Sequence, residues 1–380
     1  MNKTSNRKKI SFVFGTRPEL IKLAPLIEAC KECFELQIVS TGQHRELLDN
    51  LYSWFGFCPD EDLQVMTKNQ SPGQVIASIL SKIERPIAGS DLLIVQGDTA
   101  TAFAGAMGAF LQKIPVAHLE AGLRTQDIYN PFPEEMFRRQ ISQLASLHFA
   151  PTKAAAANLA NDGIKDNVYV LGNTVVDALK NTIRRLKQLE QDEAKFAAHV
   201  KLPFIKELTG KRVLLVTMHR RENLGQDHEQ VALALKQIVS EFSDCLVVFP
   251  VHPNPAVRKT IEPILQNNLQ VKLLEPVDYV TFCWLLQKAY VLVTDSGGLQ
   301  EEGAALGKPT LILRQTTERP EAVEAGVAKL VGSNYDAVLT SIRQLLSDEN
   351  LYQTMATATD AFGEGNSAAA IVKKLSTFLL

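Results

Sequence analysis

Hydrophobic and polar residues alternate along this chain in two kinds of segment. Short runs rich in β-branched residues, which are typical of buried strands, are separated by longer stretches in which apolar residues recur as they do in amphipathic helices. In the first half the predicted strands are ISFVF, LQIVS, DLLIVQG, IPVAHLE, LHFAP and VYVLG, and the predicted helices include HRELLDNLYSWF and EEMFRRQISQLAS. This alternation predicts parallel strands joined by helical crossovers.

The same pattern starts again in the second half, with the predicted strands RVLLVTM, CLVVFPV, VKLLEP, YVLVTD, PTLILR and AKLVG. A charged, mostly helical stretch between the two series has the character of a surface linker. We therefore predict an α/β protein with two Rossmann-like, doubly wound domains at residues 8–175 and 209–364, a helical linker at 176–208, and a C-terminal helix at 365–380 that packs back on the N-terminal domain. We expect both sheets to face one ligand-binding cleft, because open α/β sheets bind ligands at the carboxyl ends of their strands.

Composition excludes several other classes of protein. The length of 380 residues suits two domains, and the net charge of -2 gives no electrostatic case for nucleic acid. No apolar run approaches the length of a membrane span, and the apolar stretch SFVF after the basic start is too short for a secretion signal, so we expect a cytoplasmic protein with no membrane partner. The five cysteines have irregular spacing, which argues against a disulfide framework, and Cys30 and Cys33 are expected at a plain helix end.

The first candidate site is the loop GTRPE, from Gly15 to Glu19, which follows a predicted strand and opens a helix with Pro18 near its first turn. Free backbone N–H groups and Arg17 would converge at the positive end of that helix, which suits an anionic oxygen. An ordinary strand-to-helix turn with a solvated arginine is the alternative. The fingerprint G-x-G-x-x-G is missing, so no dinucleotide cofactor is expected.

A second candidate site follows the strand YVLVTD, where Ser296, Gly297 and Gly298 are predicted at a helix N-terminus that lets backbone approach a phosphate closely. Glu302 suits a pair of sugar or ribose hydroxyls, and capping of the first helical turn is the alternative role for this acid and its neighbour. Arg319, at the start of another helix after the strand PTLILR, provides a second cation for the same site.

Three carboxylates of the first half form the sharpest chemical signal. Asp98 and Glu120 end two predicted strands, and Glu134 begins the helix after the loop NPFPEE. Crowded like charges drive pKa values apart, which yields one acid and one base. Separate roles as helix caps or surface charges are the alternative.

Two histidines follow strands of the second half. His219 opens the basic run HRRE, where a donating imidazole can bind a pyrophosphate or a leaving oxygen, although a lone histidine is more often a simple hydrogen-bonding group. For His252, in VHPNPAVR, we favour a structural or phosphate-side role. No H-E-x-x-H motif and no paired C-x-x-C motif occurs, so no bound metal is expected.

Taken together, these segments resemble the non-hydrolysing UDP-N-acetylglucosamine 2-epimerases, a family with the two-domain GT-B fold. Ten segments fall in the family's order over about residues 10–375: GTRPELIKLAP, TGQHRELLD, GDTATA, HLEAGLRT, PFPEE, GNTVVDAL, HRREN, VHPNPAVR, TDSGGLQEE and TTERPEA. The resemblance implies a cofactor-independent isomerase that converts UDP-N-acetylglucosamine, or a related UDP-2-acetamido sugar, to UDP-N-acetylmannosamine through a glycal. It also implies a homodimer that serves cell-surface polysaccharide biosynthesis.

The resemblance assigns roles to individual residues. Asp98, Glu120 and Glu134 would be the acid and base carboxylates, and His219 would assist at the pyrophosphate. Phe282 would lie near the uracil, and the remaining contacts to the UDP-sugar would come from Arg17, Lys22, Ser296, Gly297, Gly298, Glu302 and Arg319. Gln43 and His44 resemble part of a second substrate site that activates some bacterial members of the family.

Four positions depart from the family pattern: Gln96, Phe137, Met218 and Gln315. They bear on the identity of the sugar more than on the reaction. A hydrolysing 2-epimerase, a GT-B glycosyltransferase and a non-enzymatic sugar-nucleotide sensor are the competing functions. The three carboxylates argue against a transferase, which needs at most one base.

Overall fold

The computed structural model describes residues 7–42, 45–67, 70–125, 127–218 and 225–380. The chain divides into two compact units. Unit 1 comprises Met1–Ala178 and Gly363–Leu380, and unit 2 comprises Leu179–Phe362. Within the described part of the chain, no helix combines the length and the apolar character that a membrane crossing requires.

Unit 1 is built on a seven-stranded sheet in the order β3-β2-β1-β4-β5-β6-β7, in which neighbouring strands are parallel. Every strand predicted in the first half is present, and only the two-residue strand β3 was missed. The strands are β1 (Lys9–Phe14), β2 (Glu35–Ser40), β3 (Glu61–Asp62), β4 (Leu92–Gln96), β5 (Val116–Leu119), β6 (Leu147–Ala150) and β7 (Val168–Val170).

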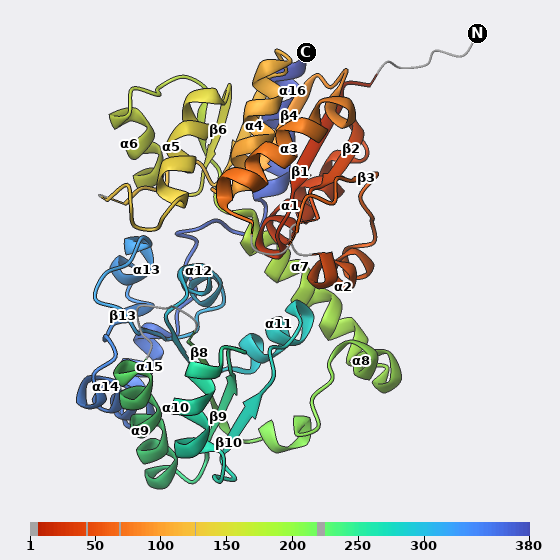
Figure 1. Ribbon diagram of the computed structural model, residues 1–380. Helices are drawn as coiled ribbons and strands as arrows, with labels where there is room; N and C mark the ends of the chain where they lie inside the picture. Colours follow the sequence, from red (N-terminus) through yellow and green to blue (C-terminus); the bar gives the residue numbers. More distant parts are fainter. Residues whose placement is uncertain (1–6, 43–44, 68–69, 126, 219–224) are drawn as a thin grey trace. The chain divides into compact units, whose positions relative to one another are not determined.

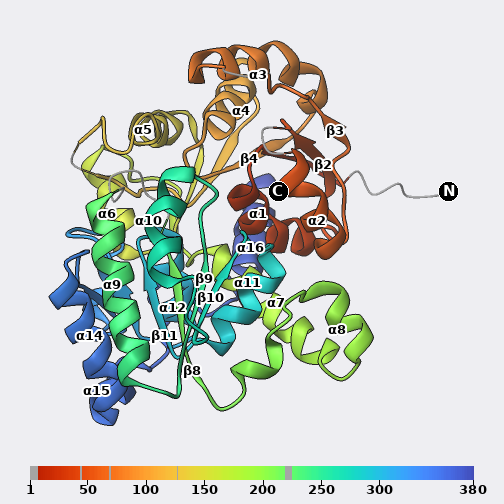
Figure 2. The ribbon, with the colours of Figure 1, turned by 60° about the horizontal axis from the view of Figure 1, so that its bottom comes forward.

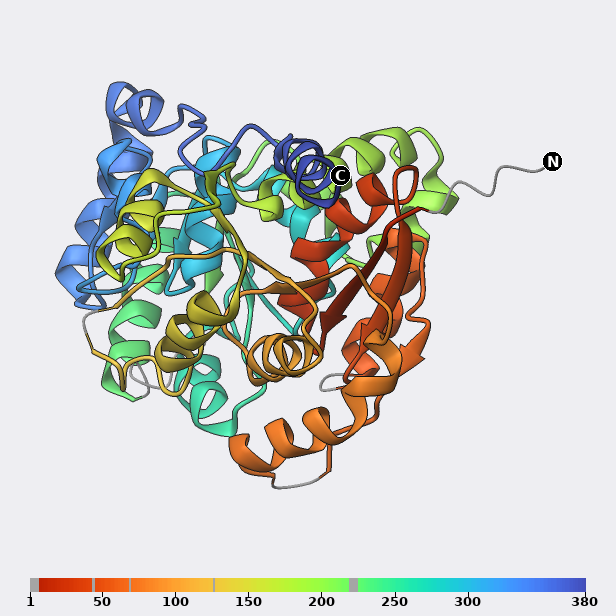
Figure 3. The same ribbon diagram turned by 90° about the horizontal axis from the view of Figure 1, so that it is seen from above.

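Two groups of helices flank this sheet. In one group α3, α4 and α5 pack side by side, and in the other α16 lies beside α1 although the two are at opposite ends of the chain (Figures 1 and 3). The helices are α1 (Arg17–Cys30), α2 (Arg45–Phe55), α3 (Pro72–Ile87), α4 (Ala100–Leu111), α5 (Glu134–Leu144), α6 (Lys153–Asn161), the start of α7 (Thr174–Leu189), and α16 (Ser367–Leu379).

The buried central strands explain this two-sided cover. Val13 of β1 belongs to the apolar cluster under α3 and α4, while Phe12 and Phe14 are fully buried and, by strand alternation, point to the opposite face. Gly108 lets α3 and α4 approach closely, since a Cβ atom there would lie 2.6 Å from Cγ2 of Ile83.

Unit 2 repeats the architecture with a six-stranded parallel sheet in the order β10-β9-β8-β11-β12-β13. All six strands were predicted: β8 (Arg212–Thr217), β9 (Cys245–Pro250), β10 (Val271–Leu274), β11 (Val291–Thr294), β12 (Thr310–Ile312) and β13 (Ala328–Leu330). Its helices after α7 are α8 (Glu193–His199), the 3-10 helix η1 (Ile205–Leu208), α9 (Gln226–Glu241), α10 (Pro255–Leu265), α11 (Tyr279–Lys288), α12 (Gly297–Ala305), α13 (Pro320–Glu324), α14 (Tyr335–Ser347) and α15 (Glu349–Met355).

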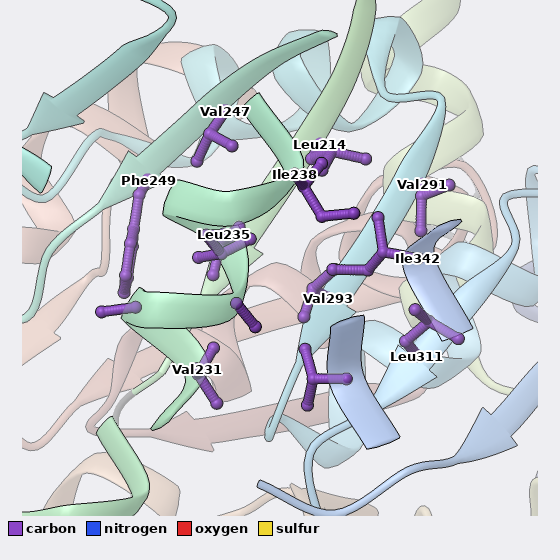
Figure 4. Packing of buried hydrophobic residues seen from close by; sticks show 14 of the residues in the cluster. Leu214, Val231, Leu235, Ile238, Val247, Phe249, Val291, Val293, Leu311 and Ile342 are labelled. Atoms are coloured by element: carbon purple, nitrogen blue, oxygen red, sulfur yellow. The ribbon is translucent and has the colours of Figure 1, made fainter. Parts of the chain in front are cut away.

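The core of unit 2 lies between its sheet and the helices α9 and α14. Leu235 and Ile238 of α9 and Ile342 of α14 pack against the strand residues Val247 and Val293, all fully buried (Figure 4). Helix α9 contacts both α10 and α14 (Figure 2). These apolar stripes on amphipathic helices hold the helices on the sheet.

Both sheets have the same order of strands, so the predicted pair of doubly wound α/β units is confirmed. The chain changes direction across each sheet between the first and the fourth strand of the series, β1 and β4 in unit 1 and β8 and β11 in unit 2. The loops that leave such a switch point are where open α/β sheets bind ligands.

The two cysteines Cys30 and Cys33 lie at the end of α1, as the sequence predicts. Cys30 is the last residue of that helix, and both cysteines are free thiols.

Candidate functional site

The switch point of unit 1 is organised by a buried carboxylate. Glu19, in the first turn of α1, is 1% exposed. Its side chain accepts hydrogen bonds from the N–H groups of Gly15 (3.0 Å) and Thr16 (2.8 Å) and from the hydroxyls of Thr16 (2.8 Å) and Thr99 (2.6 Å). The prediction of free backbone N–H groups in this loop was therefore wrong for Gly15 and Thr16. Arg17 is the half-buried first residue of α1.

Asp98 lies two residues beyond the end of β4 and is paired with a helix residue. Arg138, in α5, donates from Nε to Oδ2 at 3.0 Å, and its Nη2 group contacts the same oxygen. The neighbouring Gly97 carbonyl accepts a 2.8 Å hydrogen bond from Nε2 of His118. Burial lowers the pKa of His118 to about 3, so the ring is neutral and anchors this loop without adding charge.

Glu120 directly follows β5 and has a backbone φ of 62°, in the left-handed region that non-glycine residues seldom adopt. Its Oε2 atom contacts both the ammonium group of Lys22 and the side-chain amide of Gln96. Because backbone strain of this kind concentrates at functional sites, the geometry singles out Glu120. Gln96, one of the departures from the family pattern, holds it with a donor that does not titrate.

The third predicted carboxylate, Glu134, is the first residue of α5 and is half-buried. Its neighbour Glu135 is the fully buried one, and it pairs with Arg138 at 3.2 Å and with Arg139 at 2.8 Å. Through Arg138 the first turn of α5 is joined to Asp98. Sequence reasoning missed this pairing, although the EE and RR doublets one turn apart were a signal for it.

Phe137, the second departure from the family pattern, faces the core of unit 1. Its ring is 8% exposed and stacks on Phe103 of α4 with centroids 5.2 Å apart. It therefore acts through packing between α4 and α5.

Unit 2 presents a helix N-terminus at its switch point. Ser296 precedes α12 and makes no side-chain capping hydrogen bond. Within the part of the chain that the structure describes, the N–H groups of Gly297 and Gly298 at the first turn have no acceptor. Such N–H groups, with the positive end of the helix dipole, suit an anionic ligand.

Arg319 is held beside this helix start. Its Nε atom donates to Glu301 at 2.9 Å, and a Cβ atom added at Gly297 would lie 3.1 Å from its Nη1 atom. Glu301 is 1% exposed and compensates the arginine charge. The first turn of α12 contains no acidic residue, so the alternative capping role for Glu301 and Glu302 was wrong.

Glu302 and Phe282 lie on neighbouring elements. Burial, then electrostatic interaction with Cys283 and with Glu302 of α12, raises the pKa of Tyr279 of α11 well above its usual range. Phe282 is a half-buried residue of the same helix α11. The residues predicted to contact ribose and uracil thus lie on two helices of unit 2, α12 and α11.

In unit 1 the structure places Asp98 and Glu120 just beyond adjacent strands, with Lys22 of α1 in contact with Glu120. In unit 2 it places Arg319 beside the start of α12, at Ser296 and Gly297, whereas Glu302 lies further along that helix. His219, Gln43 and His44 lie outside the described residues. Among the residues that are described, no group of three or more side chains suits a metal ion.

Comparison with known proteins gives one consistent result. The family model described as UDP-N-acetylglucosamine 2-epimerase matches residues 28–376. The UDP-N-acetylglucosamine 2-epimerase of Salmonella typhimurium is 42% identical over 375 residues, 97% of this chain and 99% of that protein, and that of Escherichia coli K12 is 41% identical over 373 residues, 97% and 98% of the two chains. The crystal structure of the Neisseria meningitidis UDP-GlcNAc 2-epimerase bound to UDP-GlcNAc superposes with a TM-score of 0.89 at 41% identity and covers 97% of this chain and 100% of that one.

Proposed function

The chain belongs to the UDP-N-acetylglucosamine 2-epimerase family, and from this membership we propose that it interconverts UDP-N-acetylglucosamine and UDP-N-acetylmannosamine without hydrolysing them. Unit 1 would carry out proton transfer and unit 2 would hold the UDP portion. The Neisseria relative was crystallised with UDP-GlcNAc, which supports this choice of substrate.

One observation carries the proposal. Asp98 and Glu120 follow adjacent parallel strands, and each meets its own cation, Arg138 for Asp98 and Lys22 for Glu120. Two separately held carboxylates at neighbouring strand ends provide the two proton-transfer groups that inversion of a carbon centre requires. A glycosyltransferase needs only one such group.

The reaction starts from a weak C–H acid, because C2 of the sugar has no adjacent carbonyl group. As the bond between C1 and the UDP oxygen breaks, positive charge grows at C1 and the hydrogen on C2 becomes acidic. One carboxylate removes that proton, which leaves a glycal and free UDP in the site. The other group returns a proton to the opposite face of C2 while the UDP oxygen bonds again to C1, so that atoms and charge balance.

The groups of unit 2 suit the leaving diphosphate. The open first turn of α12, at Gly297 and Gly298, and the guanidinium group of Arg319 would bind the diphosphate charge of UDP in the substrate and after its departure alike. Glu302 would accept from ribose hydroxyls, and Phe282 would pack near the uracil. The family further implies a homodimer, which light scattering on the purified protein would test.

Incubation with UDP-N-acetylglucosamine in deuterated water tests the function, with NMR as the readout. The expected result is deuterium at C2 of a manno product that is still attached to UDP. Release of free N-acetylmannosamine with UDP would instead identify a hydrolysing 2-epimerase. Recovery of unexchanged substrate would exclude the proposed reaction on this sugar.

A further inference from the structure

Glu19 is a buried carboxylate for which the proposed reaction has no direct use. We propose that it is a positioning residue, which fixes the loop carrying Arg17 to the loop carrying Asp98 across the switch point of unit 1. The inference deepens the function proposed above and rests on it. Glu19 accepts hydrogen bonds from Gly15 and from Thr99, and these two residues belong to loops that leave the adjacent strands β1 and β4.

Ordinary helix capping accounts for only part of these contacts. A glutamate at the third helical position that accepts from the N–H group of the N-cap residue forms a capping box, and Glu19 does so with Thr16. Helix α3 has the same motif, in which Gln74 accepts from the Ser71 N–H group at 2.8 Å, but both residues are exposed. The bonds of Glu19 to Gly15 and Thr99 lie outside this motif.

The burial of Glu19 has a cost that capping does not explain. Burial raises the pKa of this carboxyl above its ordinary value of 4.5, against the hydrogen bonds from Thr99, Thr16 and Gly15 that lower it. Among the described residues no lysine or arginine forms an ion pair with it. A glutamine would complete the capping box equally well and without a buried charge. A glutamate that lowers stability where a glutamine would serve as the cap indicates a functional role for the carboxylate.

The residues on either side of Asp98 show what Glu19 positions. Thr99 donates its hydroxyl to Glu19 and also accepts from the Ala102 N–H group at the start of α4. Gly97, on the other side, is held by His118. Asp98 therefore projects from a loop that is fixed at both neighbours.

On the other side of the contact, Gly15 and Thr16 lead directly into Arg17. Lys22, further along the same helix, contacts Glu120. Glu19 thus joins the helix that supplies both of these cations to the loop that supplies Asp98.

Kinetics of matched variants test the inference. Glu19→Gln keeps the capping box but has one oxygen where the carboxylate uses two, and Thr99→Val removes the partner hydroxyl. We expect each to lower kcat by about tenfold to about 100-fold, the effect of a misplacement of roughly 1 Å, with KM within about threefold. Thr99→Ser keeps the hydroxyl and should keep the wild-type kcat. The double variant Glu19→Gln with Thr99→Val should be no slower than the worse single variant, because both changes remove the same hydrogen bond between Glu19 and Thr99.

The capping box of α3 provides the controls. Gln74→Ala and Ser71→Ala remove comparable cap contacts from an exposed helix start and should leave kcat unchanged. A wild-type kcat in Glu19→Gln, equal losses in the α3 variants, or additive losses in the double variant would overturn the inference.

Amide hydrogen exchange separates this inference from the proposed function. In Glu19→Gln we expect faster exchange at residues 15–16 and at residues 99–103 together, whether or not the wild type turns over UDP-N-acetylglucosamine. If the wild type did not turn over UDP-N-acetylglucosamine, the proposed function would be wrong. The exchange rates would still test whether Glu19 fixes the two loops to each other. Faster exchange confined to residues 15–16 would show that Glu19 is a helix cap only.

Discussion

The two switch points occupy the same place in sheets of the same strand order, yet they carry different groups. In unit 1 the ends of β1 and β4 are joined by the carboxylate of Glu19, whereas in unit 2 the ends of β8 and β11 are joined by the hydroxyls of Thr217 and Thr294, 2.6 Å apart. Unit 1 then presents carboxylates paired with cations, and unit 2 presents a helix start with an arginine beside it.

The difference follows from the helix N-termini. In α1 the N–H groups of Gly15 and Thr16 are occupied by Glu19, so this end has less capacity for an anion. In α12 Ser296 provides no side-chain cap. The common fold therefore sets where these groups lie, while the side chains make one place suited to proton transfer and the other suited to an anion.

Removal of the carboxylates of unit 1 should have the largest effect. Asp98→Asn and Glu120→Gln should each reduce turnover by a factor of about 10²–10⁴, because each removes a proton-transfer group, and leave UDP affinity within a few fold. Kinetics and calorimetric titration with UDP measure the two quantities. Glu61→Gln, which breaks the exposed pair with Arg85 at 3.1 Å, is the control. Loss of UDP affinity in both carboxylate variants would show that these residues bind rather than transfer protons.

A change at the helix start of unit 2 should show the opposite selectivity. Arg319→Lys removes the Nε donor to Glu301 and the planar grip on an anion, so we expect about tenfold weaker UDP binding with kcat at saturation nearly unchanged. Arg343→Lys, in an exposed pair with Glu241 of the same unit, is the matched control. A fall in kcat at unchanged UDP affinity would erase the contrast between the units.

Gln96→Glu should sharpen the role of Glu120. A second carboxylate in contact with Glu120 disfavours its ionised form, so a base at this position loses its proton only at higher pH. We expect the acidic limb of kcat/KM to move up by about one pH unit. Gln74→Glu, in an exposed capping box, should leave the profile in place. An unmoved limb in Gln96→Glu would mean that Glu120 is not the titrating base.

The smallest effect concerns stability. The pKa of Glu19 is raised by burial, so between its ordinary value of 4.5 and its folded value the folded state binds more protons than the unfolded state, and stability falls as pH rises. Glu19→Gln lacks this loss. Its thermal midpoint should match that of the wild type at a pH below 4.5 and exceed it at a higher pH, where the buried carboxyl of the wild type loses its proton. Calorimetry at both pH values measures this, and a variant less stable than the wild type at the higher pH would contradict it.

The candidate site was only partly visible in the amino-acid sequence. Asp98, Glu120 and the glycines before α12 stand at predicted strand and helix ends, where pattern alone draws attention to them. The adjacent pair Glu134 and Glu135 shows what pattern cannot decide. The buried member, Glu135, pairs with Arg138 and Arg139 of α5, and Arg138 in turn reaches Asp98, which lies 40 residues away in the sequence.

What the sequence determined by itself was the alternation of strands and helices, hence the two doubly wound units and the strand ends at which the candidate residues stand. Periodicity and β-branching are properties of neighbouring residues, so they are legible without coordinates. Only the tertiary structure decided which groups pair. Glu19 and Thr99 are separated by 80 positions, and they meet because β1 and β4 are neighbours in the sheet. Once buried there, a carboxylate must find hydrogen-bond donors, and the sheet order supplies them.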